Sequence, residues 1–460
     1  MQINIKYCLS GILFLVIALI FNSCQNKKTT IQIEGYRTIQ KVEPVTLNLI
    51  GHWYDEGKKE QLMKELINEF EFINQDVKIN MKFPEQIYFD RRKYNIEIQF
   101  NSRIVISDKP EWDIIRFNNE YYKVADSLKD PDWTKKYLVD FSEIPEFKKT
   151  TRPELLSDTI KAKYGGIIPG PFIDGYNYSF WCNTEVAKKV GIEVKQFDMT
   201  NEDLFNYVKA VYDYNKAHGD SIIAIYDAWN WQTSKTIAQE YFFSELDDYG
   251  KIINLEYNEI KVKAWFKVLY EMERLSKYKP LPNWKKISWT ETVNYPLDDK
   301  CLFYANGSWM YNIWLKKDSV KLKKMVPTEL PVFKPAHTYI GGYFVTFAVL
   351  KNAPHREQAI RFLLSINKPD VAEKWARYTK SPTGIKGNLT TYNFGLDKLE
   401  NYQYTIDRKY GNQKVDVYND SKFCFGKYND TILDRSIEVL SGILTADQAI
   451  NQIKKNLKTR

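Results

Sequence analysis

The feature that most constrains the fold is a strand-like segment followed at once by a helical segment and two more strand-like segments. Val45 to Ile50 alternates apolar and polar residues, as a half-buried strand does. Residues 58–72 carry apolar side chains at helical spacing, and residues 77–81 and 112–117 predict two further strands. Because strand, helix and strand with short connections usually form a βαβ unit, this region predicts a parallel sheet and an α/β fold.

The alternation of helices and strands continues along the chain. Apolar periodicity, capping-box patterns and a proline placed as a first helical residue predict helices at residues 200–215, 262–270, 354–363 and 445–457. Strands are expected at residues 221–226 and 338–350, whereas residues 95–107 are ambiguous between strand and helix. A chain of 460 residues exceeds what one core usually covers, so we expect two lobes, each with its own sheet.

The start of the chain has the pattern of an export signal. Residues 1–23 hold one charged side chain, Lys6, and an apolar run from 8 to 21, and the sequence turns polar directly after Cys24. A cysteine at this position resembles the lipobox of bacterial lipoproteins, which implies lipidation of Cys24 and a tether over residues 24–44. The alternative is an uncleaved anchor, but the run is shorter than the roughly 20 residues that span a bilayer. We therefore expect a protein anchored to a bacterial membrane that faces the periplasm or the exterior.

The composition is that of a globular protein and argues against several functions. The formal charge of +8 comes from 66 basic and 58 acidic residues interspersed along the chain, so nucleic acid is not expected as a partner. The four histidines form no HExxH or zinc spacing, and no phosphate-binding loop or GxSxG turn occurs. We predict no catalytic residue, no metal and no cofactor. Paired carboxylates for glycoside hydrolysis stay open, because they need only meet in space.

Three cysteines remain once the leader and the lipid position are set aside: Cys182, Cys301 and Cys424. Three scattered cysteines form neither a disulfide framework nor a paired metal motif. One disulfide stays open for an exported protein, and its pairing cannot be read from the sequence.

Aromatic residues make up 15% of the chain, and those in turns are candidate ligand contacts. Trp229 and Trp231 follow the strand at 221–226 and stand one residue apart, so they cannot both belong to one helical stripe. In a loop, both can line a cleft. Trp265 lies within an apolar helical stripe and is predicted to be core, and Trp375 is undecided.

The turn after the first strand holds a second candidate group. Trp53, Tyr54 and Asp55 lie where an open α/β sheet places its ligand, beyond the carboxyl end of a strand. We favour a ligand contact for Trp53. For Asp55, the capping of the following helix is an equally good interpretation.

Segments in order along the chain resemble the extracellular solute-binding proteins of family 1, the group that includes maltose-binding protein. They are Leu47 to Phe70, Trp112 to Tyr121, Tyr178 to Ile192, and Ala305 to Trp309 with the following Leu330-Pro331 and Gly341-Gly342. The resemblance covers residues 45 to about 390 and the terminal helix. It implies an α/β periplasmic-binding-protein-like fold, in which two lobes joined by crossing segments surround a ligand cleft.

The resemblance also implies boundaries for the parts of the chain. Crossings are expected near residues 177–183 and 331–342. The expected parts are a signal peptide at 1–23, a tether at 24–44, lobe 1 at 45–177 and about 340–400, lobe 2 at 178–339, and a C-terminal helical segment at 401–460 whose lobe stays open.

The family's pattern implies further ligand contacts. Asn118 and Glu120 fall at its polar sugar contact. Tyr176 falls at its crossover contact, and Trp309 at its stacking platform. Tyr343, after the paired glycines, could reach the same cleft. The full expected ligand-binding set is Trp53, Tyr54, Asp55, Asn118, Glu120, Tyr176, Trp229, Trp231, Trp309 and Tyr343.

This set predicts a carbohydrate ligand, with an oligosaccharide as the best fit, and a peptide or an aromatic glycoside would also suit so aromatic a cleft. Sugars offer hydroxyl rims to polar side chains and C–H patches to aromatic faces. The resemblance implies a monomer that closes its cleft around the sugar and delivers it to the permease of an ABC importer. Two alternatives stay open: a receptor subunit that reports the ligand to a membrane sensor, and an exported glycan-active enzyme.

Overall fold

The computed structural model describes residues 43–54, 56–84, 102–117, 121–226, 234–248, 252, 259–282, 294–386, 398–411, 413–415 and 429–458. Within these ranges, no helix combines the length and the apolar character that a bilayer crossing requires. The chain divides into residues 1–43 and a compact unit of residues 44–460, to which the following description applies.

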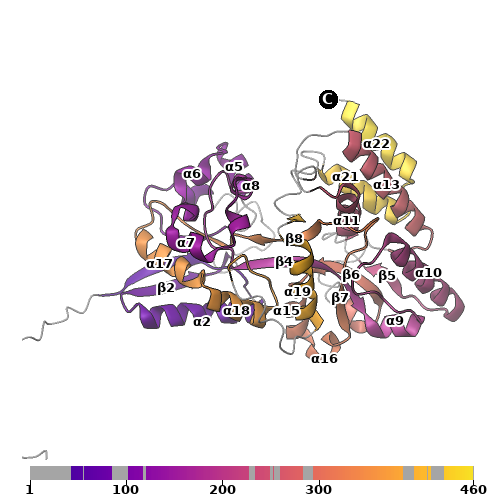
Figure 1. The fold of residues 1–460 in the computed structure, drawn as a ribbon, viewed down its shortest axis with the longest axis horizontal. Helices are drawn as coiled ribbons and strands as arrows, with labels where there is room; N and C mark the ends of the chain where they lie inside the picture. The colour runs from indigo at the N-terminus through magenta and orange to yellow at the C-terminus, as the bar shows by residue number, and fades with distance from the viewer. Residues whose placement is uncertain are drawn as a thin grey trace, which may run out of the picture. The chain divides into compact units, whose positions relative to one another are not determined.

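The first sheet grows from the predicted βαβ unit (Figure 1). Strand β1 (Val45–Ile50) pairs in parallel with β2 (Val77–Lys82) and β3 (Ile114–Arg116), and helix α2 (Lys58–Ile73) connects β1 to β2. Strand β9 (Phe347–Val349), from far along the chain, pairs antiparallel with β3. The resulting order is β2-β1-β3-β9. The predicted strands and helix of this region are confirmed.

Helices bury the apolar side chains of this sheet in a first hydrophobic cluster. Helix α2 presents Leu62, Leu66 and Phe70 at four-residue spacing, so one stripe of the helix is buried. The other contributing segments are α5 (Tyr121–Leu128), α6 (Trp133–Tyr137), η2 (Phe141–Glu143), α7 (Pro145–Thr150), η3 (Pro153–Leu156), α8 (Asp158–Lys163), α17 (Arg356–Ile366) and α18 (Pro369–Thr379). Helix α17 begins two residues after Pro354, so the prediction that this proline opens the helix is wrong.

The second sheet is centred on a long buried strand. Strand β4 (Asp174–Asn183) is buried along its whole length and pairs antiparallel with three neighbours. The sheet has the order β10-β8-β4-β6-β5, with β7 also on β4. Its other strands are β5 (Ile223–Tyr226), β6 (Cys301–Gly307), β7 (Met325–Thr328), β8 (Tyr339–Phe344) and β10 (Lys414–Val415).

A second hydrophobic cluster surrounds this sheet and includes the C-terminal helices. Its helical segments are α9 (Thr184–Val190), α10 (Asn201–His218), α11 (Ser234–Leu246), α13 (Glu259–Ser276), η5 (Tyr295–Asp298), α15 (Met310–Lys317), α16 (Ser319–Leu322), α19 (Lys398–Tyr410), α21 (Asn429–Leu440) and α22 (Ala446–Lys458). Helices α21 and α22 pack on α13, as Figure 1 shows. The predicted capping boxes at Thr200 and Thr445 are present. The C-terminal segment therefore shares its core with the second sheet.

Strands β4 and β8 connect the two clusters. The predicted β-segment 338–350 is divided, because β8 joins the second sheet while β9 joins the first. Two glycines let β4 and β8 approach closely. A Cβ on Gly341 would lie 2.7 Å from the Tyr176 carbonyl oxygen, and one on Gly175 would lie 2.6 Å from the Gly342 oxygen. The paired strands are thus the part of the fold where segments from both clusters meet.

The open questions on the cysteines and on residues 95–107 are answered in part. Cys182 and Cys301 are buried free thiols on neighbouring strands, and burial raises the pKa of Cys182 to about 12. Cys424 lies outside the described residues. Residues 102–105 are helical, and residues 95–101 also lie outside the described ranges.

Candidate functional site

Trp53, in the turn after β1, belongs to a buried cluster in which Trp53, Lys59 and Trp375 all contact Asp174, here called the clasp. The Trp53 indole Nε1 donates a hydrogen bond to Asp174 Oδ2 at 3.0 Å, and Lys59 Nζ lies 2.6 Å from the same oxygen. Trp375 Nε1 donates to the other carboxylate oxygen at 3.2 Å. Asp174 is fully buried and opens β4, so this clasp ties the turn, α2 and α18 to the start of the crossing strand.

The contacts of the clasp compensate for a strained backbone conformation at Trp53. Trp53 has a φ of 66°, in the left-handed region that costs a bulky residue about 1–3 kcal/mol. Its ring packs 4.6 Å from the Trp375 ring and 5.7 Å from that of Phe347, between centroids, and only 2% of the residue is exposed. Trp53 therefore has a fixed position in the first cluster, and its contact with a ligand stays a prediction.

His52 and Tyr54 flank Trp53 in different environments. His52 is buried, and burial, followed by the charges of Arg116 and Lys59, holds its pKa well below its usual value. The imidazole is therefore neutral near pH 7. Tyr54 is 37% exposed and packs on Phe83, so solvent reaches Tyr54 far more readily than Trp53.

The predicted residues Tyr176 and Trp309 come together on β4. Their ring centroids lie 5.5 Å apart in an edge-to-face arrangement, and Trp309 makes a similar contact with Tyr178 at 5.5 Å. Gly307, the last residue of β6, makes room for this packing. A Cβ on Gly307 would lie 2.1 Å from the Trp309 ring. Tyr176 is buried, whereas Trp309 is half-buried and keeps some exposure to solvent.

One face of β4 collects groups from both clusters. Side chains alternate across a strand, so Asp174, Tyr176 and Tyr178 lie on the same face. Trp53 contacts this face at Asp174, and Trp309 contacts it at Tyr176 and Tyr178. Two predicted ligand residues that are far apart in the sequence thus contact the same face of the crossing strand.

Tyr343 lies on the other face of the β4–β8 pair. It stands opposite Gly175, whereas Tyr176 stands opposite Gly342. The Tyr343 hydroxyl accepts hydrogen bonds from Arg152 at 2.7 Å and from Lys414 Nζ at 3.4 Å. The structure therefore does not bring Tyr343 to the aromatic face of Tyr176.

The remaining predicted residues lie outside the described part of the chain: Asp55, Asn118, Glu120, Trp229, Trp231 and the lipidation residue Cys24. Of the other tryptophans, Trp265 is core as predicted, and the undecided Trp375 is fully buried in the clasp. Among the described residues, no group of histidine, cysteine, aspartate and glutamate side chains could hold a metal ion.

Sequence reasoning missed Asp174 and Lys59. Both are charged residues whose side chains are almost fully buried, at 0% and 5% exposed, and they form one ion pair. The only available signal was a charged residue at the start of an otherwise apolar and aromatic strand. That signal does not identify a partner more than a hundred residues away.

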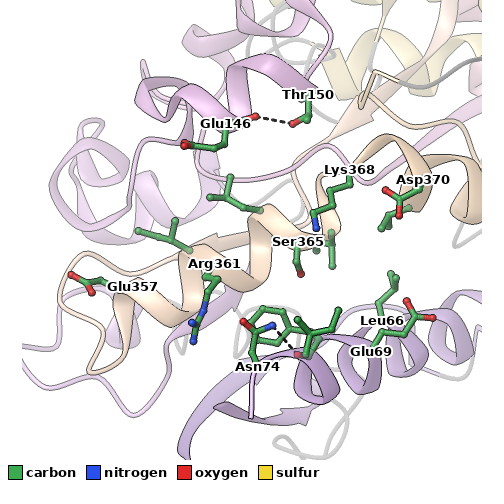
Figure 2. A pocket seen from close by; sticks show the side chains of 16 residues that line it. Leu66, Glu69, Asn74, Glu146, Thr150, Glu357, Arg361, Ser365, Lys368 and Asp370 are labelled. Atoms are coloured by element: carbon green, nitrogen blue, oxygen red, sulfur yellow. Dashed lines mark hydrogen bonds between the residues drawn. The ribbon is translucent and has the colours of Figure 1, made fainter. Parts of the chain in front are cut away.

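A pocket of about 640 Å³ opens elsewhere, between α2, α7, α17 and α18 (Figure 2). Its walls combine apolar residues of α2 and α17 with charged side chains, among them Glu69, Arg361 and Asp370, which Figure 2 labels. None of the predicted ligand-binding residues lines this pocket.

Comparison with solved structures establishes the fold. No family model and no curated protein sequence matches the chain. The binding protein MsmE of Bacillus subtilis, in an open conformation, is 16% identical with a TM-score of 0.60, covering 90% of this chain and 97% of that chain. Maltose-bound MalE3 of T. maritima is 15% identical with a TM-score of 0.62, covering 90% and 99%. A family 1 extracellular solute-binding protein of Bifidobacterium longum subsp. infantis is 14% identical with a TM-score of 0.60, covering 91% and 100%.

These likenesses confirm the predicted fold class. The chain has the α/β, periplasmic-binding-protein-like fold of these binding proteins, over nearly their full length. The resemblance read from short sequence segments is thereby confirmed at the level of the fold.

Proposed function

We propose that this protein captures a carbohydrate outside the cytoplasm, as the binding component of an ABC importer. The observation that carries the proposal is the half-buried Trp309, whose ring stands edge-on to Tyr176 and Tyr178 on the face of β4 that Trp53 reaches at Asp174. Aromatic rings match the C–H patches of a sugar. Solved structures with the same fold include a protein in complex with raffinose and another in complex with stachyose.

The mechanism follows from the position of this face. A sugar that contacts segments of both clusters interacts best with an arrangement in which these segments are close, so it shifts the population toward that arrangement. Polar groups around the site would replace the water of the sugar hydroxyls. A buried polar group left unpaired costs about 1–3 kcal/mol, which makes the fit selective for one sugar.

The proposal includes the location and partners of the protein. The leader pattern supports lipidation of Cys24 and a place in the cell envelope, facing the periplasm or the exterior. The protein would act as a monomer and present its sugar-loaded form to the permease subunits of the importer. It would bind the sugar without cleaving it.

Thermal unfolding of the mature protein with a panel of oligosaccharides tests the proposal. A sugar at 100 times its Kd should raise the free energy of unfolding by about 2.7 kcal/mol. Chromatography of the recovered sugar should show it unchanged. If no sugar in a broad panel shifts the unfolding transition, the proposed function is wrong. If the sugar is cleaved, the protein is a glycan-active enzyme instead.

A further inference from the structure

Asp174 is a buried carboxylate that three separate elements of the first cluster reach. Its side chain is 0% exposed, and it is the first residue of β4. Oδ2 accepts hydrogen bonds from the Trp53 indole and the Lys59 ammonium group, and Oδ1 accepts one from the Trp375 indole. These donors lie in the turn after β1, on α2 and on α18, and the two helices pack against each other (Figure 1). One side chain therefore joins three elements to the strand that connects the clusters.

The stability of the core does not by itself explain the ion pair of Asp174 and Lys59. Both side chains are removed from water, at 0% and 5% exposed. Replacement of such a buried pair by apolar residues of similar volume is often neutral or stabilising, because the cost of desolvating two charges disappears. An apolar residue at position 174 would fill the same space, but it could not accept a hydrogen bond. The carboxylate thus contributes a fixed acceptor for two indole groups.

Trp53 is the donor whose position depends most on such an acceptor. Its φ of 66° lies in a region that a bulky residue adopts only when the surrounding structure holds it there. Its carbonyl oxygen accepts a hydrogen bond from the Glu56 amide at 3.1 Å, so the same residue shapes the turn. If the backbone of Trp53 relaxed to an ordinary φ, the chain direction after it would change. Tyr54, the next residue and the more exposed one, would then move with it.

We propose that Asp174 is the positioning residue of the sugar site, because it fixes the turn that holds Trp53 and Tyr54 relative to Trp309. The inference rests on the proposed function, and it deepens that function by naming a buried residue that acts through its neighbours. Asp174 shares its face of β4 with the two tyrosines that contact the Trp309 ring. One strand therefore places both groups of expected ligand contacts in a common frame.

A positioning role and a purely structural role predict different results. If Asp174 only supports the core, its replacement lowers the stability of the protein, and the folded fraction binds sugar as before. If Asp174 positions the turn, the folded protein binds sugar more weakly even where stability is retained. The loss of affinity should also depend on Trp53, since the indole N–H is the group through which Asp174 holds the turn.

The double variant Asp174→Leu/Lys59→Met tests the inference. It replaces both charges with apolar side chains of similar size, so no unpaired charge stays buried. Its circular dichroism spectrum should match that of wild type. Isothermal titration with the sugar identified in the panel should show binding weakened about tenfold. In a protein that already carries Trp53→Phe, which keeps a ring but removes the indole N–H, the same double substitution should cause little further loss.

Asp113→Asn is the matched control. Asp113 is also a buried carboxylate of the first cluster, at 1% exposed. It accepts hydrogen bonds from the Asn48 amide of β1 and from the amide of His355, which precedes α17, both at 2.9 Å. These partners belong to the core of the sheet and not to the turn. The substitution should lower the unfolding temperature and leave the affinity of the folded protein for sugar unchanged.

The indole N–H of Trp53 gives a second measurement that needs no sugar. In protein with isotope-labelled tryptophan, its nuclear magnetic resonance signal is the one that Trp53→Phe removes. Exchange of this proton with solvent should be slow in wild type and about tenfold faster or more in Asp174→Leu/Lys59→Met.

Three outcomes would contradict the inference. It is wrong if the double variant binds sugar as tightly as wild type, if its loss of affinity adds in full to that of Trp53→Phe, or if the exchange of the Trp53 indole proton is unchanged. In each of these cases the wild-type protein still binds sugar, and the proposed function stands. A wild-type protein that binds no sugar would instead refute the proposed function, and the role of Asp174 in a sugar site with it.

Discussion

At the scale of single residues, Trp309 is the side chain whose role in ligand binding can best be distinguished from a role in the core. Its ring is held edge-on by Tyr176 and Tyr178, and the residue is half-buried. Trp314, five residues later, is fully buried. Two tryptophans in one short segment therefore have different roles, and substitution can distinguish them.

We predict that Trp309→Ala weakens sugar binding at least tenfold while the unfolding temperature changes little. The reason is that the substitution removes a ring face from the site but leaves the buried core around it in place. Isothermal titration with the sugar identified in the panel measures the affinity. Trp314→Ala is the control, and it should cost about 3–5 kcal/mol of stability because it empties a buried site. A Trp309→Ala protein that unfolds as readily as Trp314→Ala would show that Trp309 is core.

His52 gives a prediction for pH dependence. Its native pKa lies well below normal because of burial and the nearby charges of Arg116 and Lys59. Below about pH 6.5 the unfolded chain takes up a proton at this histidine and the native protein does not. The stability that depends on neutral His52 is therefore complete above this pH and declines as the pH falls, by at most about 1.4 kcal/mol per unit.

Denaturant unfolding of wild type and His52→Asn between about pH 7 and pH 5 measures this contribution. The variant should have the flatter profile. Its circular dichroism spectrum at pH 7 should match that of wild type, which controls for a change of fold. Parallel profiles would mean that His52 is protonated in the native state and that its burial has no electrostatic cost.

The sequence indicated where the candidate residues lie but not how they are held. The turn after β1 was recognised because it follows a strand, and Trp53 is found there. The clasp on Asp174 was not foreseeable, because Asp174 is separated from Trp53 by 121 positions. Tyr343 shows the same limit, since the face on which it lies depends on its pairing with Gly175 across strands.

At the scale of elements, local patterns predicted structure well and long-range pairing poorly. Strand β1, helix α2 and the capping boxes at Thr200 and Thr445 depend on neighbouring residues, and all four were recognised. The division of residues 338–350 between two sheets was missed. Its residues are buried on both sides, so no change of periodicity marks the point where the chain leaves one sheet for the other.

The contact between α11 and β8 gives a prediction at this scale. Glu240 is fully buried on α11, and its Oε2 accepts a hydrogen bond from the Ile340 amide at 3.1 Å, whereas Oε1 has no partner. Burial raises the pKa of Glu240 well above normal. The unfolded chain releases this proton above about pH 4.3 while the native protein keeps it, so stability is complete below that pH and declines as the pH rises.

Glu240→Gln should therefore be more stable than wild type at pH 7 and equally stable at pH 4, because the amide replaces the protonated acid without a charge. Thermal unfolding at both pH values measures the difference. Glu245→Gln, on the same helix at the surface and paired with Lys267, is the control and should change stability by less than about 1 kcal/mol. A Glu240→Gln protein that is less stable at pH 7 would show that the native carboxylate is ionised.

At the scale of the whole molecule, two hydrophobic clusters share one chain that crosses between them more than once. The first cluster gathers residues from the start of the chain and from α17 and α18, and the second includes the C-terminal helices. A ligand that contacts both can act only if each cluster keeps its own structure while the crossing strands adjust. A destabilising substitution in one core should therefore leave the stability of the other core unchanged.

We predict that a cavity in one core leaves the other protected from hydrogen exchange. Leu363 on α17 and Leu269 on α13 are both fully buried, one in each cluster, and substitution by alanine should cost about 2–5 kcal/mol in either case. Because the buried apolar residues form two separate clusters, Leu363→Ala should raise exchange in β1 and α2 but not in α10 and α13. Leu269→Ala should do the reverse, and β4 should respond to both. Mass spectrometry of the exchanging peptides measures this pattern. An equal rise in both cores from either variant would mean that the molecule opens as one unit, and closure around a sugar by movement of separate lobes would then lose its physical basis.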